Sequence, residues 1–336
     1  MRKTRIAVVG AGTIGRAHMD ALRASTTCEL AAVVDPAPAA KAPYRSLDEL
    51  LARDRPDGVV LATPNRLHLP QALECIAAGV PVLIEKPVTA TVAEGEQLLH
   101  HAGHARVLVG HHRAHSPIMA EAKRVVESGK LGRLVSVMGS ALFHKPDGYF
   151  DEGPWRREAG GGPLLINLIH EIHNLRMLCG EIAAVQAFAS NAVRRFPVED
   201  TAAINFRFAN GVLGTFMLSD TAACARSWEQ TARENPIYAS YDDQDCYVIA
   251  GTKGSLAVPT MRLDVFAGEP SWRTPFQRER IEFERADPLA RQMEHFGAVA
   301  RREAEPLVSL RDGVANVRVT DAIVEAAKTG RTVTLQ

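Results

Sequence analysis

Three glycines at the spacing G-x-G-x-x-G follow a short apolar run near the start of the chain. They are Gly10, Gly12 and Gly15, with Thr13 and Ile14 before the last of them. In such a motif the first glycine permits a tight turn, the second lets the backbone approach a pyrophosphate, and the third lets a helix pack closely on its strand. The N-terminus of that helix binds phosphate through its free N–H groups. These five residues therefore predict a dinucleotide-binding turn.

Asp35 stands 20 residues beyond Gly15, after a second apolar run. A carboxylate at this position accepts hydrogen bonds from the adenosine ribose hydroxyls and repels a 2′-phosphate, so the residue predicts NAD as the cofactor. Lys41 and Arg45 lie downstream and could reach a 2′-phosphate, which makes NADP the alternative. A glycine turn in an α/β domain that binds no nucleotide is the other interpretation.

Such a turn must be positioned by a strand before it and by helices around it, and the first 110 residues contain both patterns. Short β-branched runs alternate with amphipathic stretches such as Leu47–Ala52 and Pro70–Ala78, the second of which is followed by Gly79. Apolar strands that alternate with helices are typical of a parallel sheet covered on both faces. The expected strands are Arg5–Val9, Glu29–Val34, Gly58–Ala62, Val82–Glu85 and Val107–Gly110.

The rest of the chain contains longer strand patterns. Thr201–Phe208 and Val212–Ser219 flank Asn210-Gly211, a dipeptide that strongly favours a β-hairpin. Leu134–Leu142 and Val185–Val193 are also expected to be strands. One helix is expected to begin at Pro163, where the missing N–H of proline costs nothing, and to end with Cys179 before Gly180; another is expected over Gly313–Lys328.

The composition excludes several classes of protein. The 336 residues include 39 basic and 39 acidic side chains, and zero net charge argues against a dedicated partner of nucleic acid or of an anionic membrane. No apolar run reaches the roughly 18 residues of a membrane-spanning helix, and Ile6–Val9 is too short for the core of a signal peptide. The five cysteines are scattered without a C-x-x-C pair, which predicts free thiols and a cytoplasmic location.

Two further motifs follow the glycine turn. Ala62–His68 contains T-P-N-x-x-H, and Glu85-Lys86-Pro87 stands at the end of an expected strand. Later in the chain come Ser128–Gly132, Gly160–Gly162 and Gly251–Leu256. In this order the set resembles the glucose-fructose oxidoreductase / inositol dehydrogenase family (Gfo/Idh/MocA), and the resemblance spans most of the chain.

The resemblance implies an α/β protein of two domains. Residues 1–117 are expected to form an NAD(P)-binding Rossmann domain with a doubly wound parallel sheet. Residues 118–336 are expected to form an α+β domain for substrate binding and oligomerisation, with a large, mostly antiparallel sheet and a last helix that packs back near the first domain. A homodimer or homotetramer is expected. Beyond the glycine turn and Asp35, the implied cofactor contacts are Thr63, Pro64, Asn65, His68, Glu85 and Lys86.

Lys86 is the residue that the resemblance places beside the nicotinamide. An ammonium there can hydrogen-bond the reacting hydroxyl and stabilise a developing alkoxide, or, with a lowered pKa, it can shuttle the proton. A solvated lysine at a strand end is the alternative.

His170 is the second catalytic candidate. Many family members read G-G-G-x-x-x-D-x-x-x-H, and here the glycines and His170 match while Ile166 stands at the aspartate position. The usual carboxylate partner of the histidine is thus missing. Asn167, three residues before His170, is expected to hydrogen-bond the substrate or the histidine. An imidazole suits acid–base work near neutral pH, and a core histidine is the alternative.

Four more residues are substrate candidates: His112, Arg113, Trp155 and His173. The first two follow the last expected parallel strand, Trp155 precedes the three glycines, and His173 lies one helical turn beyond His170. Solvated loops or helix surfaces are the alternatives. No metal site is expected, because the H-E-I-H run that ends at His173 is one residue short of the H-E-x-x-H zinc spacing.

Together with the resemblance, these residues predict an NAD-dependent dehydrogenase that oxidises a secondary hydroxyl of a sugar, a cyclic polyol or a related small molecule by hydride transfer. One alternative is a dehydrogenase of an anionic sugar or an aromatic cis-dihydrodiol. A glycosidase-like enzyme that uses NAD without net redox change is another. The third is a non-catalytic NAD-binding regulator, suggested by Ile166.

Overall fold

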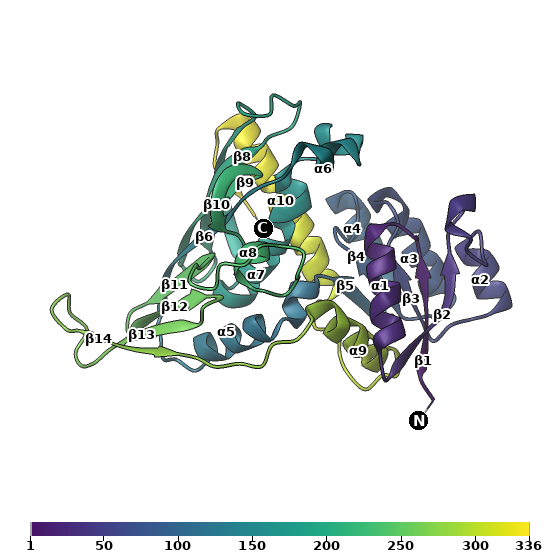
Figure 1. The fold of residues 1–336 in the computed structure, drawn as a ribbon, viewed down its shortest axis with the longest axis horizontal. Helices are drawn as coiled ribbons and strands as arrows, with labels where there is room; N and C mark the ends of the chain where they lie inside the picture. The colour runs from purple at the N-terminus through teal and green to yellow at the C-terminus, as the bar shows by residue number, and fades with distance from the viewer. Residues whose placement is uncertain (1, 336) are drawn as a thin grey trace. The chain divides into compact units, whose positions relative to one another are not determined.

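The computed structural model describes residues 2–335, which divide into two compact units. The first contains the residues up to Ser116 together with Ala286–Val317, and the second contains Pro117–Arg285 together with the residues from Arg318 onward. Each unit has its own sheet, and the two sheets can be followed by their strand labels in Figure 1.

The sheet of the first unit has five parallel strands in the order β2-β1-β3-β4-β5. Most of their residues are apolar, and the last three strands are buried at every position, which confirms the predicted Rossmann-like sheet. The order of strands reverses between β1 and β3, and sheets of this kind bind ligands beyond the carboxyl ends of the strands at such a reversal. The strands are β1 (Thr4–Val9), β2 (Cys28–Val34), β3 (Gly58–Leu61), β4 (Val82–Glu85) and β5 (Val107–Gly110).

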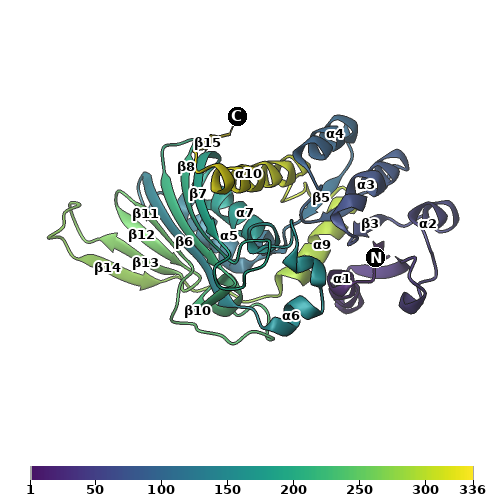
Figure 2. The same cartoon turned by 90° about the horizontal axis from the view of Figure 1, so that it is seen from above.

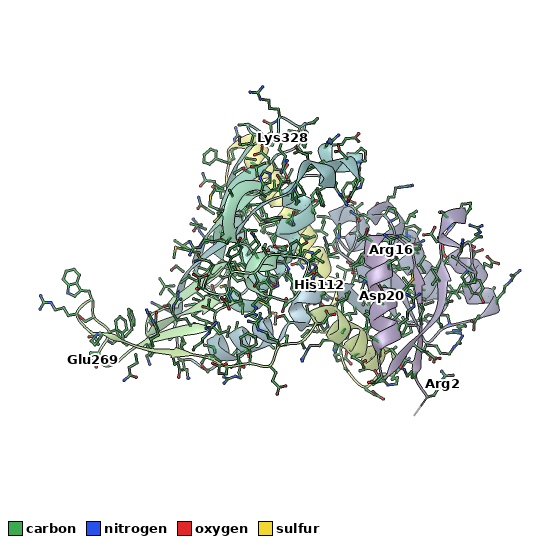
Figure 3. All side chains as sticks on the ribbon, viewed as in Figure 1. Arg2, Arg16, Asp20, His112, Glu269 and Lys328 are labelled. Atoms are coloured by element: carbon green, nitrogen blue, oxygen red, sulfur yellow. The ribbon has the colours of Figure 1, made fainter. Side chains whose placement is uncertain are left out.

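Helices connect these strands. The first, α1 (Thr13–Ala24), begins directly after the glycine turn and buries Gly15, His18, Met19 and Leu22, while Arg16 and Asp20 lie on its exposed side (Figure 3). The other connecting elements are α2 (Leu47–Arg53), α3 (His68–Ala77), α4 (Val92–Ala102) and the short 3₁₀ turns η1 (Pro38–Ala40), η2 (Asn65–Leu67) and η3 (His112–His115).

A segment from far along the chain also belongs to the first unit. Helix α9 (Pro288–Ala300) packs against α1 and against strands β1, β2 and β5 of the sheet. Its N-terminus is capped by the Asp287 side chain, which accepts the N–H of Leu289 at 2.8 Å. Gly297 of α9 lies so close to Cys28 that a Cβ would stand 2.3 Å from Sγ. The sequence predicts this segment in the second domain, residues 118–336, since it carries none of the nucleotide-binding motifs.

The second unit is built on a ten-stranded sheet in the order β14-β13-β12-β11-β6-β9-β8-β7-β15, with β10 paired to β6. Neighbours are antiparallel except β6 and β9, so the expected large, mostly antiparallel sheet is confirmed. The strands are β6 (Leu134–His144), β7 (Ile182–Ser190), β8 (Thr201–Phe208), β9 (Leu213–Ser219), β10 (Thr221–Arg226), β11 (Tyr247–Gly251), β12 (Gly254–Val258), β13 (Arg262–Phe266), β14 (Phe276–Arg280) and β15 (Val333–Thr334).

The Asn210-Gly211 hairpin forms between β8 and β9 as predicted. Gly211 has φ of 89°, and the Asn210 side chain accepts the N–H of Val212 at 3.2 Å. Strand β7 begins at Ile182, three residues before the expected start, and the strands after β9 had not been predicted. These later strands have at most six residues, and β14 is exposed along its whole length, so each gives only a weak strand pattern. The hairpin of β13 and β14 extends beyond the sheet with Glu269 near its tip (Figure 3).

Helices cover one face of this sheet. Figure 2 shows α5 (Pro117–Glu127), α7 (Ile169–Cys179) and the later part of α10 (Leu310–Thr329) along the same side, and their apolar residues form the core with the inward side chains of the strands. Shorter elements join them: α6 (Asp147–Asp151), η4 (Pro154–Arg157), the π-helix η5 (Leu164–Leu168) and α8 (Trp228–Thr231). None of the helices in the described part of the chain is long and apolar enough to cross a membrane.

Candidate active site

The glycine turn joins β1 to α1 at the point where the strand order reverses. Gly10 has φ of 98°, and a Cβ there would stand 2.5 Å from the carbonyl oxygen of Ala62 at the end of β3. A Cβ on Gly15 would stand 1.9 Å from the carbonyl oxygen of Gly10. Gly12, in contrast, borders open space, with no described atom within 4 Å of an added Cβ. Packing therefore requires Gly10 and Gly15, while Gly12 leaves the start of α1 bare, as an approaching phosphate needs.

Asp35 follows β2 and holds the glycine turn. Its Oδ2 accepts the N–H of Ala11 at 2.8 Å, and its Oδ1 accepts the N–H of Ala37 at 2.8 Å. Each carboxylate oxygen retains lone-pair capacity for a ribose hydroxyl. Arg45 donates to the carbonyl of Pro36 at 2.8 Å, so a guanidinium lies beside the same turn.

The T-P-N-x-x-H motif and the E-K-P motif are joined by His68. This side chain is fully buried, with Nε2 2.9 Å from the carbonyl oxygen of Thr63 and Nδ1 2.9 Å from that of Pro87. Burial lowers the pKa of His68, although the two carbonyls act in the opposite direction. The hydroxyl of Thr63 donates to Gln71 at 2.7 Å, and Asn65 begins the η2 turn. His68 thus fixes two loops at the carboxyl ends of β3 and β4.

Glu85 is a buried carboxylate directly before Lys86. Its Oε1 lies 2.7 Å from Nε2 of His18, and its Oε2 accepts the backbone N–H of Lys86 at 3.1 Å. Burial by itself raises the pKa of Glu85, but the hydrogen bond to His18 and the nearby positive charges hold that pKa below its ordinary value. Gly110 on β5 leaves the room that this carboxylate fills, because a Cβ there would stand 2.9 Å from Cδ of Glu85. The arrangement fixes the backbone from which Lys86 extends.

His18 was not predicted from the sequence. It is completely buried in α1 and ties that helix to the end of β4 through Glu85. The available signal was a histidine within the apolar stripe of a helix, since such a side chain needs a polar partner once it is buried.

The side chains of residues 111–115, directly after β5, lie in different environments. Burial and the charge of Arg113 lower the pKa of His112 to about 3, so this imidazole is neutral at ordinary pH. His111 lies with Nε2 3.0 Å from Nδ2 of Asn316, and the ring of His115 lies 5.1 Å from the ring of His295. Arg113 is buried. Among residues 2–335 no group of three or more His, Cys, Asp or Glu side chains could hold a metal ion.

In the second unit the three glycines precede the π-helix. Glu199 caps this helix by accepting the N–H of Leu164 at 3.0 Å, and a Cβ on Gly162 would stand 2.1 Å from Oε1 of the same carboxylate. A Cβ on Gly161 would stand 2.4 Å from the carbonyl oxygen of Trp155. The glycines therefore let the chain pass between Glu199 and η4. A π-helix is a costly local form that is frequent at functional sites, and nothing in the sequence signalled it.

His170 and His173 both lie on α7 and are both buried, so the helix-surface alternative for His173 is wrong. Between them Glu171 accepts a hydrogen bond from the hydroxyl of Tyr247, and the amide of Asn174 donates to the same hydroxyl at 3.0 Å. These bonds tie α7 to β11.

Asn167, which was expected to contact the substrate or His170, places its Oδ1 2.7 Å from Nζ of Lys145. Lys145 follows β6, and no local signal in the sequence distinguished it. Trp155 is 56% exposed, while Arg156 beside it stacks on Tyr149 with 3.8 Å between the guanidinium carbon and the ring centroid. In this turn Trp155 is thus solvated, whereas Arg156 packs on a neighbouring ring.

The amino-acid sequence matches two family models and known proteins. A family model described as "Oxidoreductase family, NAD-binding Rossmann fold" matches residues 4–112, and one described as "GFO/IDH/MocA C-terminal domain" matches residues 119–257. The rhizopine catabolism protein MocA of Rhizobium meliloti is 29% identical over 54% of this chain, an alignment that spans 59% of that protein.

Two relatives align over nearly the whole chain. Inositol 2-dehydrogenase of Rhizobium meliloti (strain 1021) is 24% identical, over 98% of this chain and 99% of that protein. The crystal structure of the WlbA dehydrogenase from Bordetella pertussis, in complex with NADH and UDP-GlcNAcA, superposes with a TM-score of 0.76 at 25% identity and covers 100% of this chain and 99% of that chain.

Proposed function

Because the chain belongs to the Gfo/Idh/MocA oxidoreductase family, with an NAD-binding Rossmann fold, we propose that it oxidises a secondary hydroxyl of a sugar, a cyclic polyol or a related small molecule with NAD. The observation that carries the proposal is the placement of Lys86. It follows β4, at the carboxyl edge of the sheet that also holds the glycine turn and Asp35, and the buried Glu85 fixes its backbone. Inositol 2-dehydrogenase and the WlbA dehydrogenase support this substrate class by their names.

In this reaction the C–H bond gives a hydride to the nicotinamide and the hydroxyl gives up a proton, so that the alcohol becomes a ketone. We propose that Lys86 and His170 are the groups that take up and pass on the proton of this hydroxyl. The cofactor site is then completed by Thr13, Ile14, Thr63, Pro64 and Asn65. His68, which the sequence predicts as a cofactor contact, does not contact the cofactor but is buried and positions the loops at Thr63 and Pro87. The substrate contacts that we propose are His112, Arg113, Trp155, Asn167 and His173. The neutral imidazole of His112 serves there as a hydrogen-bonding group, since its pKa of about 3 prevents it from carrying a charge.

The function is tested by screening sugars, inositols and aromatic cis-dihydrodiols with NAD and NADP while following the absorbance of the reduced cofactor. Steady reduction with a free hydroxy compound supports the dehydrogenase. Cleavage of a glycoside with the cofactor left unchanged would establish the glycosidase-like alternative instead. Cofactor binding without turnover of any of these compounds would favour a regulator.

The choice of cofactor depends on Asp35. Asp35→Asn keeps one carbonyl oxygen for the turn but removes the charge that repels a 2′-phosphate, so we expect the affinity for NADPH relative to NADH to rise about 10-fold, the effect typical of one charged hydrogen bond. Fluorescence titration with both reduced cofactors measures this ratio. Asp20→Asn, on the exposed face of α1, is the matched control. Tighter binding of NADPH by the native protein would contradict the assignment, and Arg45 would then be the residue to test.

The uncovered face of the large sheet supports the expected homo-oligomer. It exposes Met138, Phe188, Leu213 and Met217 on strands β6, β7 and β9, and apolar side chains gathered in this way favour a protein interface. We propose that two copies pair through this face, and that Met138→Glu with Phe188→Glu yields monomers by light scattering. Gln97→Glu, on α4, is the control; an unchanged mass in the double variant would exclude this face.

The free thiols of all five cysteines support the cytoplasmic location that we propose.

A further inference from the structure

The helical segment that leads into His170 is held at its start by an acid from a distant loop, and the mechanism above does not use that acid. Glu199 lies two residues before β8, and its Oε1 accepts the backbone N–H of Leu164 at 3.0 Å across 35 residues of sequence. Leu164 is the first residue of the π-helix, which continues directly as α7. Asn167 lies in the π-helix and His170 in the first turn of α7, so this bond fixes the segment that carries both candidates.

The first turn of the π-helix obtains one of its hydrogen bonds from this acid. Pro163 has no N–H to donate, and the N–H groups of the two residues after Leu164 donate to the carbonyl oxygen of Gly162 at 3.2 and 3.1 Å. The N–H of Leu164 itself goes to Glu199. Because the first N–H groups of a helix lack partners within the helix, the carboxylate supplies the acceptor that this turn needs.

The carboxylate of Glu199 fills the space that a side chain at position 162 would occupy. A Cβ on Gly162 would stand 2.1 Å from Oε1, 2.5 Å from Cδ and 2.7 Å from Oε2 of Glu199, and these are its three nearest neighbours. Gly162 has no positive φ, so its backbone would accept an ordinary side chain. The third glycine of the G-G-G motif therefore serves the contact with Glu199 and not the conformation of a turn.

The backbone beside Glu199 is held by the large sheet. The N–H of Asp200 donates to the carbonyl oxygen of Ser190, the last residue of β7, at 2.8 Å. The carbonyl oxygen of Asp200 accepts the N–H of Asp220 at 3.0 Å, and Val198 is buried. The place of the acceptor is therefore set by the sheet, as a group that positions others requires.

The other end of the segment is fixed separately. Glu171 and Asn174 both bind the hydroxyl of Tyr247, and these bonds hold α7 on β11. A π-helix is a costly local form, and its relaxation to an α-helix would turn the residues before α7 by about 100°, the angle that one residue spans at 3.6 residues per turn. His170 would then stay with α7 while Asn167 would leave its place beside it.

We propose that Glu199 is a positioning residue of the active site: its bond to Leu164, made from the space that Gly162 leaves, keeps the π-helix and so sets the place of Asn167 relative to His170. This inference rests on the proposed dehydrogenase function, in which both side chains serve the substrate. The carboxylate contributes a hydrogen-bond acceptor at one point and takes no part in proton transfer. Glutamine offers an oxygen at the same reach and can replace it, whereas aspartate is one methylene too short.

The first test replaces Glu199 in three ways and measures kcat/KM for a hydroxy compound that the screen identifies, together with the affinity for NADH. Glu199→Ala and Glu199→Asp are expected to lower kcat/KM about 100-fold and to change NADH affinity less than about threefold, since a misplacement of about 1 Å can cost that much in rate. Glu199→Gln is expected to stay within about threefold of the native value. If aspartate keeps the activity and glutamine loses it, or if alanine leaves kcat/KM unchanged, the positioning role is wrong.

Gly162→Ala tests the same contact from its other side. The new Cβ would displace the carboxylate, so this variant is also expected to lose about 100-fold in kcat/KM. The double variant with Glu199→Ala should lose no more than either single one, because both changes remove one interaction. Losses that multiply would overturn the proposal. Glu279→Ala, an exposed acid that pairs with Lys130, and Gly148→Ala, in open space, are the matched controls.

A readout that needs no turnover separates this inference from the proposed function. Hydrogen exchange followed by mass spectrometry is expected to show amides of the π-helix exchanging about 10-fold faster in Glu199→Ala and Gly162→Ala, with Glu199→Gln and the amides of β11 unchanged. Should Glu199→Ala fail to fold, Glu199→Asp makes the same comparison. Equal exchange in all variants overturns the inference even in an active dehydrogenase. The expected pattern in a chain that oxidises no hydroxy compound would instead refute the proposed function and leave the hold of Glu199 on the π-helix established.

Discussion

Replacement of Lys86 by methionine is expected to lower kcat about 1000-fold while the affinity for NADH stays within about threefold. Methionine has a similar length and keeps the apolar stem, but it removes the amino group, which in its neutral form we assign to accept the proton of the reacting hydroxyl. A positioned acid–base group contributes between about 100-fold and 10,000-fold to a rate, and the backbone bond from Lys86 to Glu85 does not depend on the side chain. Single-turnover cofactor reduction and fluorescence titration measure the two quantities.

The control for this variant is Lys123→Met, on the exposed side of α5, where Lys123 pairs with Glu127. It is expected to leave both quantities unchanged. If Lys86→Met retains more than a tenth of the native kcat, the proton is handled elsewhere, and His170 becomes the first residue to replace. If it loses NADH affinity to the same extent as kcat, the lysine serves cofactor binding and the assignment to catalysis is wrong.

Two of the groups beside Lys86 keep a constant charge around neutral pH. The pKa of Glu85 is held below its ordinary value by the hydrogen bond to His18, and the pKa of His112 is lowered to about 3 by burial. Glu85 is therefore ionised and His112 neutral across the range in which dehydrogenases are assayed. A change of kcat/KM with pH in that range consequently reports on other groups, and its loss in Lys86→Met would identify the lysine as one of them.

The strands of the first unit are predicted well because the residues that indicate each strand and its end are adjacent in the sequence. Each parallel strand is a short run of apolar residues that ends in glycine, proline or a polar motif, and Val82–Glu85 and Val107–Gly110 have the predicted bounds. The glycine turn and Asp35 lie within one strand–helix–strand unit, so their proximity follows from the chain itself. The hairpin at Asn210-Gly211 is a local signal of the same kind.

In the second unit the sequence indicated Asn167 as a site residue but neither of its neighbours Lys145 and Asp220, because distant segments bring the three together. Lys145, Asn167 and Asp220 come together only through the packing of the π-helix against strands β6 and β10, and sequence spacing carries no information about that packing. The pair of His18 and Glu85 joins residues 67 positions apart for the same reason. Helix α9 belongs to the first unit because it packs on α1, and the composition of its sequence does not indicate that contact.

The second large effect is expected in the glycine turn, where alanine at Gly15 and alanine at Gly12 should change the free energy of unfolding by very different amounts. Gly15→Ala is expected to destabilise the protein by about 3 kcal/mol or more, because the new Cβ would stand 1.9 Å from the carbonyl oxygen of Gly10 and that oxygen belongs to backbone that cannot turn aside. Denaturant unfolding measures this loss. Gly12→Ala adds the same methyl group in open space, so its unfolding free energy should stay within about 0.5 kcal/mol of the native value.

The same Gly12→Ala variant should nevertheless lose NADH affinity by about 100-fold, since the methyl group occupies the space through which the backbone approaches the pyrophosphate. Gly103→Ala is an unsuitable control because φ there is 51°, whereas Gly148, with open space around it and no positive φ, offers a matched one. A Gly12→Ala protein that is stable and binds NADH normally would mean that the cofactor does not approach the turn at Gly12. In that case Asp35, which bonds the same turn through Ala11, would lose its assigned role as well.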